Sequence, residues 1–86
     1  MTDSLYELRK FVLIDLINRG YEYIAKDKDG NLCAYSRPPV KKGCVWDFDK
    51  ASNTDKMEDI SVVSRIFPDI EWENVEPYRI PCINKL

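Results

Sequence analysis

Residues 21–36, YEYIAKDKDGNLCAYS, carry the most specific local pattern of the chain. Aromatic and branched side chains suited to a pleated surface lie on both sides of Asp27-Lys28-Asp29-Gly30. Asp27 can accept backbone N–H groups where the turn begins, and Gly30 supplies the positive φ that closes a type I turn with a bulge. The stretch therefore predicts a β-hairpin.

The same turn partly matches the calcium-binding loop of an EF-hand, with Asp27, Asp29 and Gly30 at the third, fifth and sixth positions. Ala25 and Ser36 then occupy the first and last positions, where the loop needs an aspartate and a bidentate glutamate. A hard cation would lack most of its charge neutralisation there. We therefore prefer an ordinary hairpin turn and expect no metal.

The whole chain has 86 residues, which is the size of one small domain, residues 1–86. Such a domain buries only about 60–65% of its unfolded surface, which favours a binding module over an enzyme with a deep cleft. The 13 basic and 15 acidic residues leave no global positive charge to hold nucleic acid. Histidine, the commonest general base and metal ligand, is absent. We expect neither catalysis nor a cofactor.

The cysteines and the N-terminal residues indicate in which cellular compartment the protein is expected. Cys33, Cys44 and Cys82 are odd in number and lack metal-like spacing, which is typical of reduced thiols rather than a secreted disulfide framework. No run of about 18 apolar residues is present. Asp3 and Glu7 flank the first hydrophobic residues, unlike the pattern of a signal peptide. We expect a cytoplasmic protein with no membrane partner.

Residues 4–19 predict an amphipathic helix. Ser4 and Glu7 form the S-x-x-E pattern of a capping box, and Gly20 can adopt the left-handed conformation that ends a helix. Apolar residues form a stripe at helical spacing, and further ones widen it: Leu5, Leu8, Val12 and Leu16, then Tyr6, Phe11, Leu13, Ile14 and Ile17. Either a sheet wraps the helix on both sides, which we prefer, or some of Tyr6, Phe11, Leu13 and Ile17 pack against something outside the fold.

A basic segment follows the hairpin. Pro38 and Pro39 withhold backbone donors and exclude a central strand, so residues 37–43 should form a loop or an edge. The densest basic cluster of the chain lies here, next to an aromatic residue, and this combination suits phosphates or an acidic partner. The predicted contact residues are Tyr35, Arg37, Lys41 and Lys42. The alternative is a solvated loop.

The middle of the chain predicts one more strand, a loop and a helical turn. Residues 44–49, CVWDFD, alternate strictly and predict a third strand that packs Trp46 on the helix. Residues 50–57 are polar and predict the longest loop. Apolar residues at helical spacing before Pro68 predict a short helical turn. Two adjacent valines are also compatible with a strand, which is the alternative for this segment.

The C-terminal part of the chain is acidic. Ile70 and Trp72 are candidates for the core, and residues 78–80 predict a short last strand. Four carboxylates form an acidic patch that contrasts with the basic segment: Asp69, Glu71, Glu73 and Glu76. This patch is either a solvated strand face or a surface that binds another protein through its carboxylates.

Together these elements predict an α+β fold. An N-terminal amphipathic helix should pack on a small, mainly antiparallel sheet of three to five strands, with a short helical turn before Pro68.

The order of these segments resembles a family of small proteins of unassigned function encoded by phages and prophages of Gram-positive bacteria. The similarity spans most of residues 20–80, through YEYIAKDKDGNLCAYSRPPVKKG, a tryptophan-containing strand and IFPDIEWENVEPYRI. Its recurrent features are Tyr23, Ala25, Asp27, Asp29-Gly30, Leu32, Ala34-Tyr35, Pro39, Trp46, Phe67-Pro68, Trp72, Glu73 and Glu76-Pro77. The resemblance implies an accessory protein inside a bacterial host cell, and it implies no catalytic or ligand-binding residue.

These observations favour a protein–protein interaction module, regulatory or host-modulating, that performs no catalysis. The alternative is a nucleic-acid-binding accessory protein that uses Tyr35 and the loop of residues 37–42. The two patches also have opposite charge. If the basic loop of one chain met residues 69–76 of a second, a two-fold homodimer would satisfy both contacts at once.

Overall fold

The computed structural model describes residues 4–86, and its first element is the helix α1, Ser4–Asn18. The helix ends as predicted, because Gly20 takes a φ of 94°. The Gly20 N–H bonds the Ile17 carbonyl at 3.0 Å, and the Tyr21 N–H bonds the Leu16 carbonyl at 2.9 Å. This pair of bonds is a Schellman motif, which satisfies the last helical carbonyls. The predicted helix and its end are confirmed. The predicted capping box is not, because Ser4 already lies inside α1 and makes no side-chain hydrogen bond with Glu7. Asp3, used above in the signal-peptide argument, lies outside the described residues.

The predicted hairpin is confirmed as strands β1, Tyr23–Lys26, and β2, Leu32–Tyr35, which pair antiparallel. Gly30 has a φ of 99°. Its N–H bonds the Asp27 carbonyl at 2.9 Å, and the Asp27 N–H bonds the Asn31 carbonyl at 2.8 Å. Gly30 therefore closes the turn as the sequence predicts. The side chain that accepts a backbone N–H inside the turn is Asp29, which bonds the Asn31 N–H at 3.0 Å, and not Asp27 as predicted.

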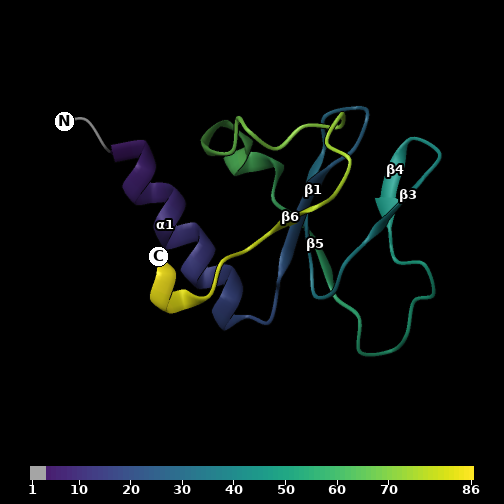
Figure 1. Cartoon of the computed structure of the whole chain (residues 1–86), viewed down its shortest axis with the longest axis horizontal. Coiled ribbons are helices and arrows are strands. Elements are labelled where there is room, and N and C mark those ends of the chain that lie inside the picture. The colour runs from purple at the N-terminus through teal and green to yellow at the C-terminus, as the bar shows by residue number, and fades with distance from the viewer. Residues whose placement is uncertain (1–3) are drawn as a thin grey trace.

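The hairpin forms the centre of a four-stranded sheet with the order β5-β2-β1-β6 (Figure 1). The edge strands are β5, Met57–Asp59, and β6, Tyr78–Arg79, and both pair antiparallel. The short last strand is confirmed as β6. The prediction of a continuous loop over residues 50–57 is wrong at its end, because Met57 already pairs with Tyr35. The fold is α+β, with a helix on a mainly antiparallel sheet.

Residues 40–47 form a separate two-stranded sheet, β3, Val40–Lys42, and β4, Val45–Asp47. The prediction of a strand within residues 44–49 is confirmed as β4, but its placement with Trp46 against the helix is wrong, because Trp46 belongs to a second cluster of buried residues. Lys42 pairs with Val45 across a two-residue turn, and such a local closure costs less chain entropy than pairing with a distant strand. The basic segment therefore supplies an edge strand of its own hairpin.

The remaining elements of the described residues 4–86 are two 3₁₀ turns. The predicted helical turn before Pro68 is confirmed as η1, Ser61–Ile66, and the Asp59 carboxylate accepts the Ser61 N–H at its start at 2.8 Å. The last turn, η2, Ile83–Lys85, lies against α1 (Figure 1). Within the described part of the chain, no helix is long and apolar enough to cross a membrane.

The central hairpin is buried on both faces, and each face belongs to a different hydrophobic cluster. Because side chains alternate along a strand, Ile24 and Leu32 point to the face that α1 covers, while Ala25 and Tyr35 point to the face that the β3–β4 hairpin covers. Figure 1 shows α1 and the β3–β4 hairpin at opposite ends of the molecule, whose longest extent is 42 Å. The first cluster contains Leu13, Leu16, Tyr21, Ile24, Leu32, Ala34, Ile60, Ile66, Phe67, Ile70 and Ile80. The second contains Ala25, Cys33, Tyr35, Trp46 and Phe48.

The outer side of α1 is not covered by the sheet. Leu13 is buried, as a core residue of the helix should be, but Tyr6 and Phe11 are 63% and 65% exposed. Leu5 and Leu8 are exposed as well. The preferred prediction, a sheet that wraps the helix on both sides, is wrong for these four residues, because the sheet contacts only one side of α1.

Candidate functional site

Arg37 of the basic segment is bound within the molecule. Its Nε and Nη2 each lie 2.7 Å from an oxygen of Asp55, and its guanidinium also donates to the Lys50 carbonyl and stacks on the Phe48 ring, 4.9 Å from the centroid. The bidentate pair holds the pKa of the Asp55 carboxyl below its ordinary value. Arg37 therefore ties the loop of residues 50–56 to the second cluster and has little capacity left for a partner.

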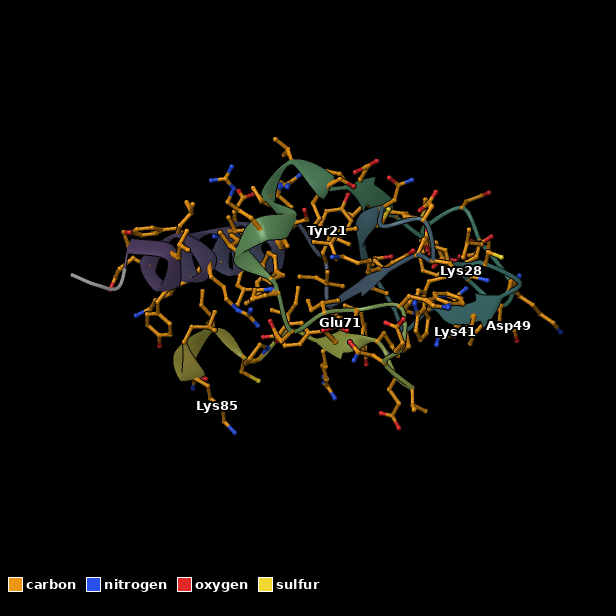
Figure 2. All side chains as sticks on the ribbon, turned by 90° about the horizontal axis from the view of Figure 1, so that it is seen from above. Tyr21, Lys28, Lys41, Asp49, Glu71 and Lys85 are labelled. Carbon is orange, nitrogen blue, oxygen red and sulfur yellow. The ribbon has the colours of Figure 1, made fainter. Side chains whose placement is uncertain are left out.

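The two lysines of this segment also make contacts inside the chain. Lys42 donates to the Asp49 carbonyl at 3.2 Å. The Lys41 ammonium lies 4.3 Å from the centroid of the Trp72 ring and 5.4 Å from that of Trp46. Its position on the β3–β4 hairpin is labelled in Figure 2. These are cation–π distances.

Tyr35 is completely buried, so it cannot touch a partner in this fold. The prediction that Tyr35 is a contact residue is therefore wrong. Its hydroxyl donates to the Trp46 carbonyl at 3.0 Å, and burial raises the pKa of the phenol. The sequence placed Tyr35 beside the basic loop correctly. It did not show that β3 and β4 cover the face of the sheet from which this side chain points.

Asp69 of the acidic patch is also a structural residue. Both of its carboxylate oxygens accept hydrogen bonds from Arg9 of α1, at 2.6 and 3.0 Å, and Arg9 donates to the Ile66 carbonyl as well, at 3.2 Å. The guanidinium holds the pKa of the Asp69 carboxyl below its ordinary value. This pair joins α1 to the segment after η1, and the sequence offered no signal for it because the partners are 60 residues apart.

The other three acidic residues differ from Asp69. Glu71, Glu73 and Glu76 are exposed, and their carboxylates make no hydrogen bond or ion pair with any described residue. Residues 71–76, here named the acidic loop, form turns and not the strand face that the alternation suggested. The Asn74 side chain accepts the Glu71 N–H at 2.9 Å, and the Asn74 N–H bonds the Glu71 carbonyl at 3.1 Å.

The acidic loop is anchored on its inner side. Ile70, just before it, is 2% exposed and belongs to the first cluster, and Trp72 packs against the second cluster. Val75 at the tip is 88% exposed. The loop therefore presents three carboxylates and one apolar side chain to solvent from a fixed base. The prediction that Ile70 and Trp72 belong to the core is confirmed for Ile70, while Trp72 is only partly buried.

The basic segment and the acidic loop meet in one molecule, through Lys41 and Trp72. The sequence separates them by about thirty residues and suggested that they meet between two chains. The contact that sequence reasoning missed is this stacking. The one sequence feature that pointed to it was a tryptophan between two glutamates. Such an arrangement attracts a cation of the same chain or a cation of a partner.

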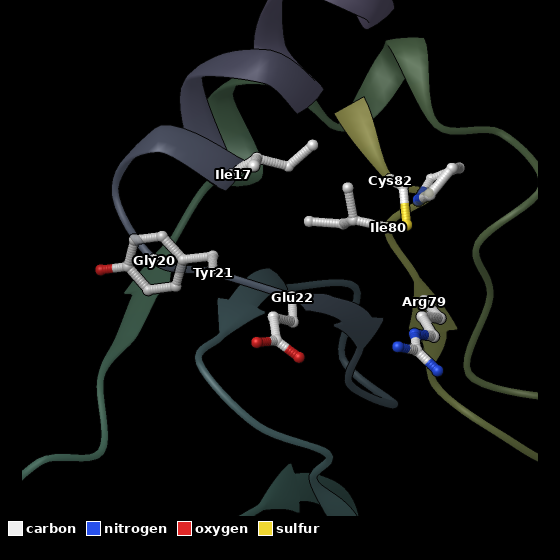
Figure 3. A pocket seen from close by; sticks show the side chains of 8 residues that line it. Ile17, Gly20, Tyr21, Glu22, Arg79, Ile80 and Cys82 are labelled. Carbon is white, nitrogen blue, oxygen red and sulfur yellow. The ribbon is translucent and has the colours of Figure 1, made fainter. Parts of the chain in front are cut away.

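A cavity of about 270 Å³ lies at the end of α1 (Figure 3). Ile17, Tyr21 and Ile80 supply apolar walls, and Glu22 and Arg79 supply one charge of each sign. Its volume is below the range of about 300–1,000 Å³ that is typical of ligand pockets. The described residues contain no group of three or more potential metal ligands. The acidic loop is therefore the strongest candidate site.

Comparisons with protein-family models, with curated proteins and with solved structures found no match to this chain.

Proposed function

We propose that this protein is a protein–protein interaction module whose acidic loop docks on a basic surface of its partner. The observation that carries the proposal is the difference between the two predicted patches. Arg37, Lys41 and Lys42 are engaged inside the molecule, whereas Glu71, Glu73 and Glu76 are exposed and unpaired among the described residues.

Three carboxylates within six residues repel one another, and a cationic surface would relieve that repulsion. The base of the loop is already ordered by Ile70 and by the two bonds of Asn74. Less conformational entropy is then lost when the loop binds. Both effects favour a partner protein with lysine or arginine at its surface.

The nucleic-acid alternative has less support. The aromatic side chain assigned to base stacking, Tyr35, is buried, and Arg37 is paired with Asp55. The exposed carboxylates of the acidic loop would repel phosphates. Binding of this kind would weaken steeply with salt, by about 0.7 to 0.9 in log K per log unit of salt for each phosphate neutralised.

The biological setting is a proposal that depends on the resemblance alone. It places the module among accessory proteins of phages or prophages, regulatory or host-modulating, acting without catalysis in the cytoplasm of a bacterial host. Homodimerisation remains a prediction too. The reciprocal contact between basic and acidic segments would have to replace the internal pairs of Arg37 and Asp69. A monomeric mass by light scattering at high concentration would contradict the dimer.

A tagged pull-down from a bacterial lysate, with and without nuclease, tests the interaction. The test variant carries Glu71→Lys, Glu73→Lys and Glu76→Lys. The matched control carries the same change of charge at three other exposed acidic residues: Glu7→Lys, Glu22→Lys and Asp49→Lys.

We expect one protein at near-stoichiometric yield that survives nuclease, is lost with the test variant and is kept with the control. Equal retention by the two variants would remove the acidic loop from the interface. Enrichment that disappears with nuclease would favour the nucleic-acid alternative instead.

A further inference from the structure

Two tryptophans form a corner that already contains a cation. The Trp46 and Trp72 rings meet edge to face, with centroids 6.5 Å apart and planes at 76°. The Lys41 ammonium lies over both rings, closer to Trp72. Trp46 is 4% exposed and forms the fixed wall of the corner. Trp72 is partly exposed and forms the open wall.

Lys41 is held in this corner only weakly. Its ammonium makes no hydrogen bond or ion pair with the described residues, and the residue is exposed. An exposed cation–π contact of this kind changes an equilibrium by only about two- to fivefold. A second cation that stacks better, or brings additional bonds, can therefore displace Lys41.

The surroundings of the corner favour a cation from outside. Glu71 and Glu73 flank Trp72 in the acidic loop, and both are exposed and unpaired among the described residues. Arginine combines the two interactions that this place offers, because its planar guanidinium stacks on an aromatic ring and pairs in bidentate fashion with a carboxylate. Lysine, the residue already there, offers a point charge only.

We propose that the Trp46–Trp72 corner is a recognition subsite for an arginine side chain in a basic segment of the partner, and that Lys41 is an internal occupant which this arginine displaces. The inference rests on the proposed function and names the chemistry of its central contact. It also gives Lys41 a role that its position in the basic segment did not suggest: it lowers the affinity of the corner for every external cation by the same factor, so that only a cation with favourable contacts of its own, such as arginine, occupies the corner.

The two tryptophans are the only ones in the chain, so intrinsic fluorescence reports on the corner directly. The probes are hexa-arginine and hexa-lysine peptides, acetylated and amidated, titrated into the full chain at low salt. The test variant is Lys41→Met, which keeps an unbranched apolar stem and removes the ammonium. The control is Lys42→Met, which changes the net charge equally but removes a lysine that bonds the Asp49 carbonyl and does not lie over a ring.

We expect hexa-arginine to change the tryptophan fluorescence and to bind the wild-type chain more tightly than hexa-lysine does. Lys41→Met should raise the affinity for both peptides about two- to fivefold beyond the increase seen with Lys42→Met. In the free protein, ring currents should shift the Lys41 side-chain methylene signals upfield in NMR spectra, and saturation with hexa-arginine should move them back.

Equal affinities of the two lysine variants, or no preference for arginine, would overturn the subsite. The proposed function would survive that result if the peptides still failed to bind the variant that carries Glu71→Lys, Glu73→Lys and Glu76→Lys. If neither peptide binds the wild-type chain even at low salt, the subsite is overturned and the basic partner is removed from the proposed function as well.

Discussion

The Asp27 side chain accepts a hydrogen bond from the Trp46 backbone N–H at 2.8 Å, and this bond joins the turn of the β1–β2 hairpin to the β3–β4 hairpin. The Lys28 N–H adds a second link, to the Cys44 carbonyl at 3.0 Å. The sequence assigned Asp27 to its own turn. In the structure its carboxylate instead holds the strand that carries the fixed wall of the aromatic corner.

Replacing Asp27 should therefore separate the effect of its hydrogen bond from the effect of its charge. Asp27→Ala leaves the Trp46 N–H without its acceptor and should lower the free energy of unfolding by about 1–3 kcal/mol. Asp27→Asn keeps an acceptor oxygen and should cost less. Urea denaturation at pH 7 measures both values, and equal losses in the two variants would contradict a specific bond.

The pH dependence of the same residue has a definite sign. Burial, with a smaller contribution from the carboxylates of Asp29, Asp47 and Asp59, raises the pKa of Asp27 above its ordinary value of 3.8. The folded state then binds more protons than the unfolded state between the two pKa values, so the contribution of Asp27 to stability falls as the pH rises through that interval. Asp27→Asn should abolish this decline, as urea denaturation at several pH values would show.

Tyr35 should affect stability and not partner binding. Tyr35→Phe removes the donor to the Trp46 carbonyl and leaves a buried acceptor unpaired, which should cost about 1–3 kcal/mol. The ring and its edge-to-face contact with Phe48 remain. Under conditions where the variant is folded, its yield of partner in the pull-down should equal that of the wild type. A selective loss of the partner would return Tyr35 to the interface.

Arg9 and Asp69 should contribute unequally to the attachment of α1. Arg9 also stacks on Phe67 and Tyr78, 4.7 and 5.3 Å from the ring centroids. Arg9→Met should lower the free energy of unfolding by about 1–2 kcal/mol, whereas Asp69→Asn should cost less than about 1 kcal/mol, because the Asp69 side chain is 53% exposed.

The Arg9 pair should also change stability in acid. Since the pKa of Asp69 is lowered in the folded state, its contribution is present above the unfolded pKa and is lost as the pH falls through the folded pKa. In both variants the free energy of unfolding, measured by urea denaturation at several pH values, should decrease less at low pH than in the wild type. Asp69→Asn should keep the partner, which separates Asp69 from the three glutamates of the acidic loop.

The three cysteines should react with thiol reagents in two classes. Cys44 and Cys82 are exposed, and Cys33 is buried. Burial, aided by the carboxylates of Asp59 and Asp27, raises the pKa of Cys33 to about 11, so its reactive thiolate is scarce near neutral pH. Titration with a disulfide reagent should modify two thiols quickly, and the third only when denaturant unfolds the chain. Fast reaction of all three would contradict the buried position of Cys33.

The elements that could be predicted from the sequence are those whose hydrogen bonds close within a few residues. At the end of α1, the Gly20 N–H bonds the Ile17 carbonyl and the following N–H bonds the Leu16 carbonyl. In the hairpin, Gly30 closes the turn that begins at Asp27. Glycine is chosen at both positions because φ is positive there. Such local closure depends little on the rest of the chain, so the amino acids themselves determine it.

The site depended on contacts between distant residues. Two of its predicted members, Arg37 and Asp69, find partners 18 and 60 residues away and become structural, while the burial of Tyr35 depends on a hairpin that covers its face of the sheet. Lys41 and Trp72 are about thirty residues apart in the sequence and meet only in the folded chain.

The sequence by itself thus determined the helix, the central hairpin and the supply of charges. Which charges are satisfied and which remain free was decided by the tertiary structure, because an ion pair or a stacked cation requires two groups within a few ångströms, and only the folded chain brings them there.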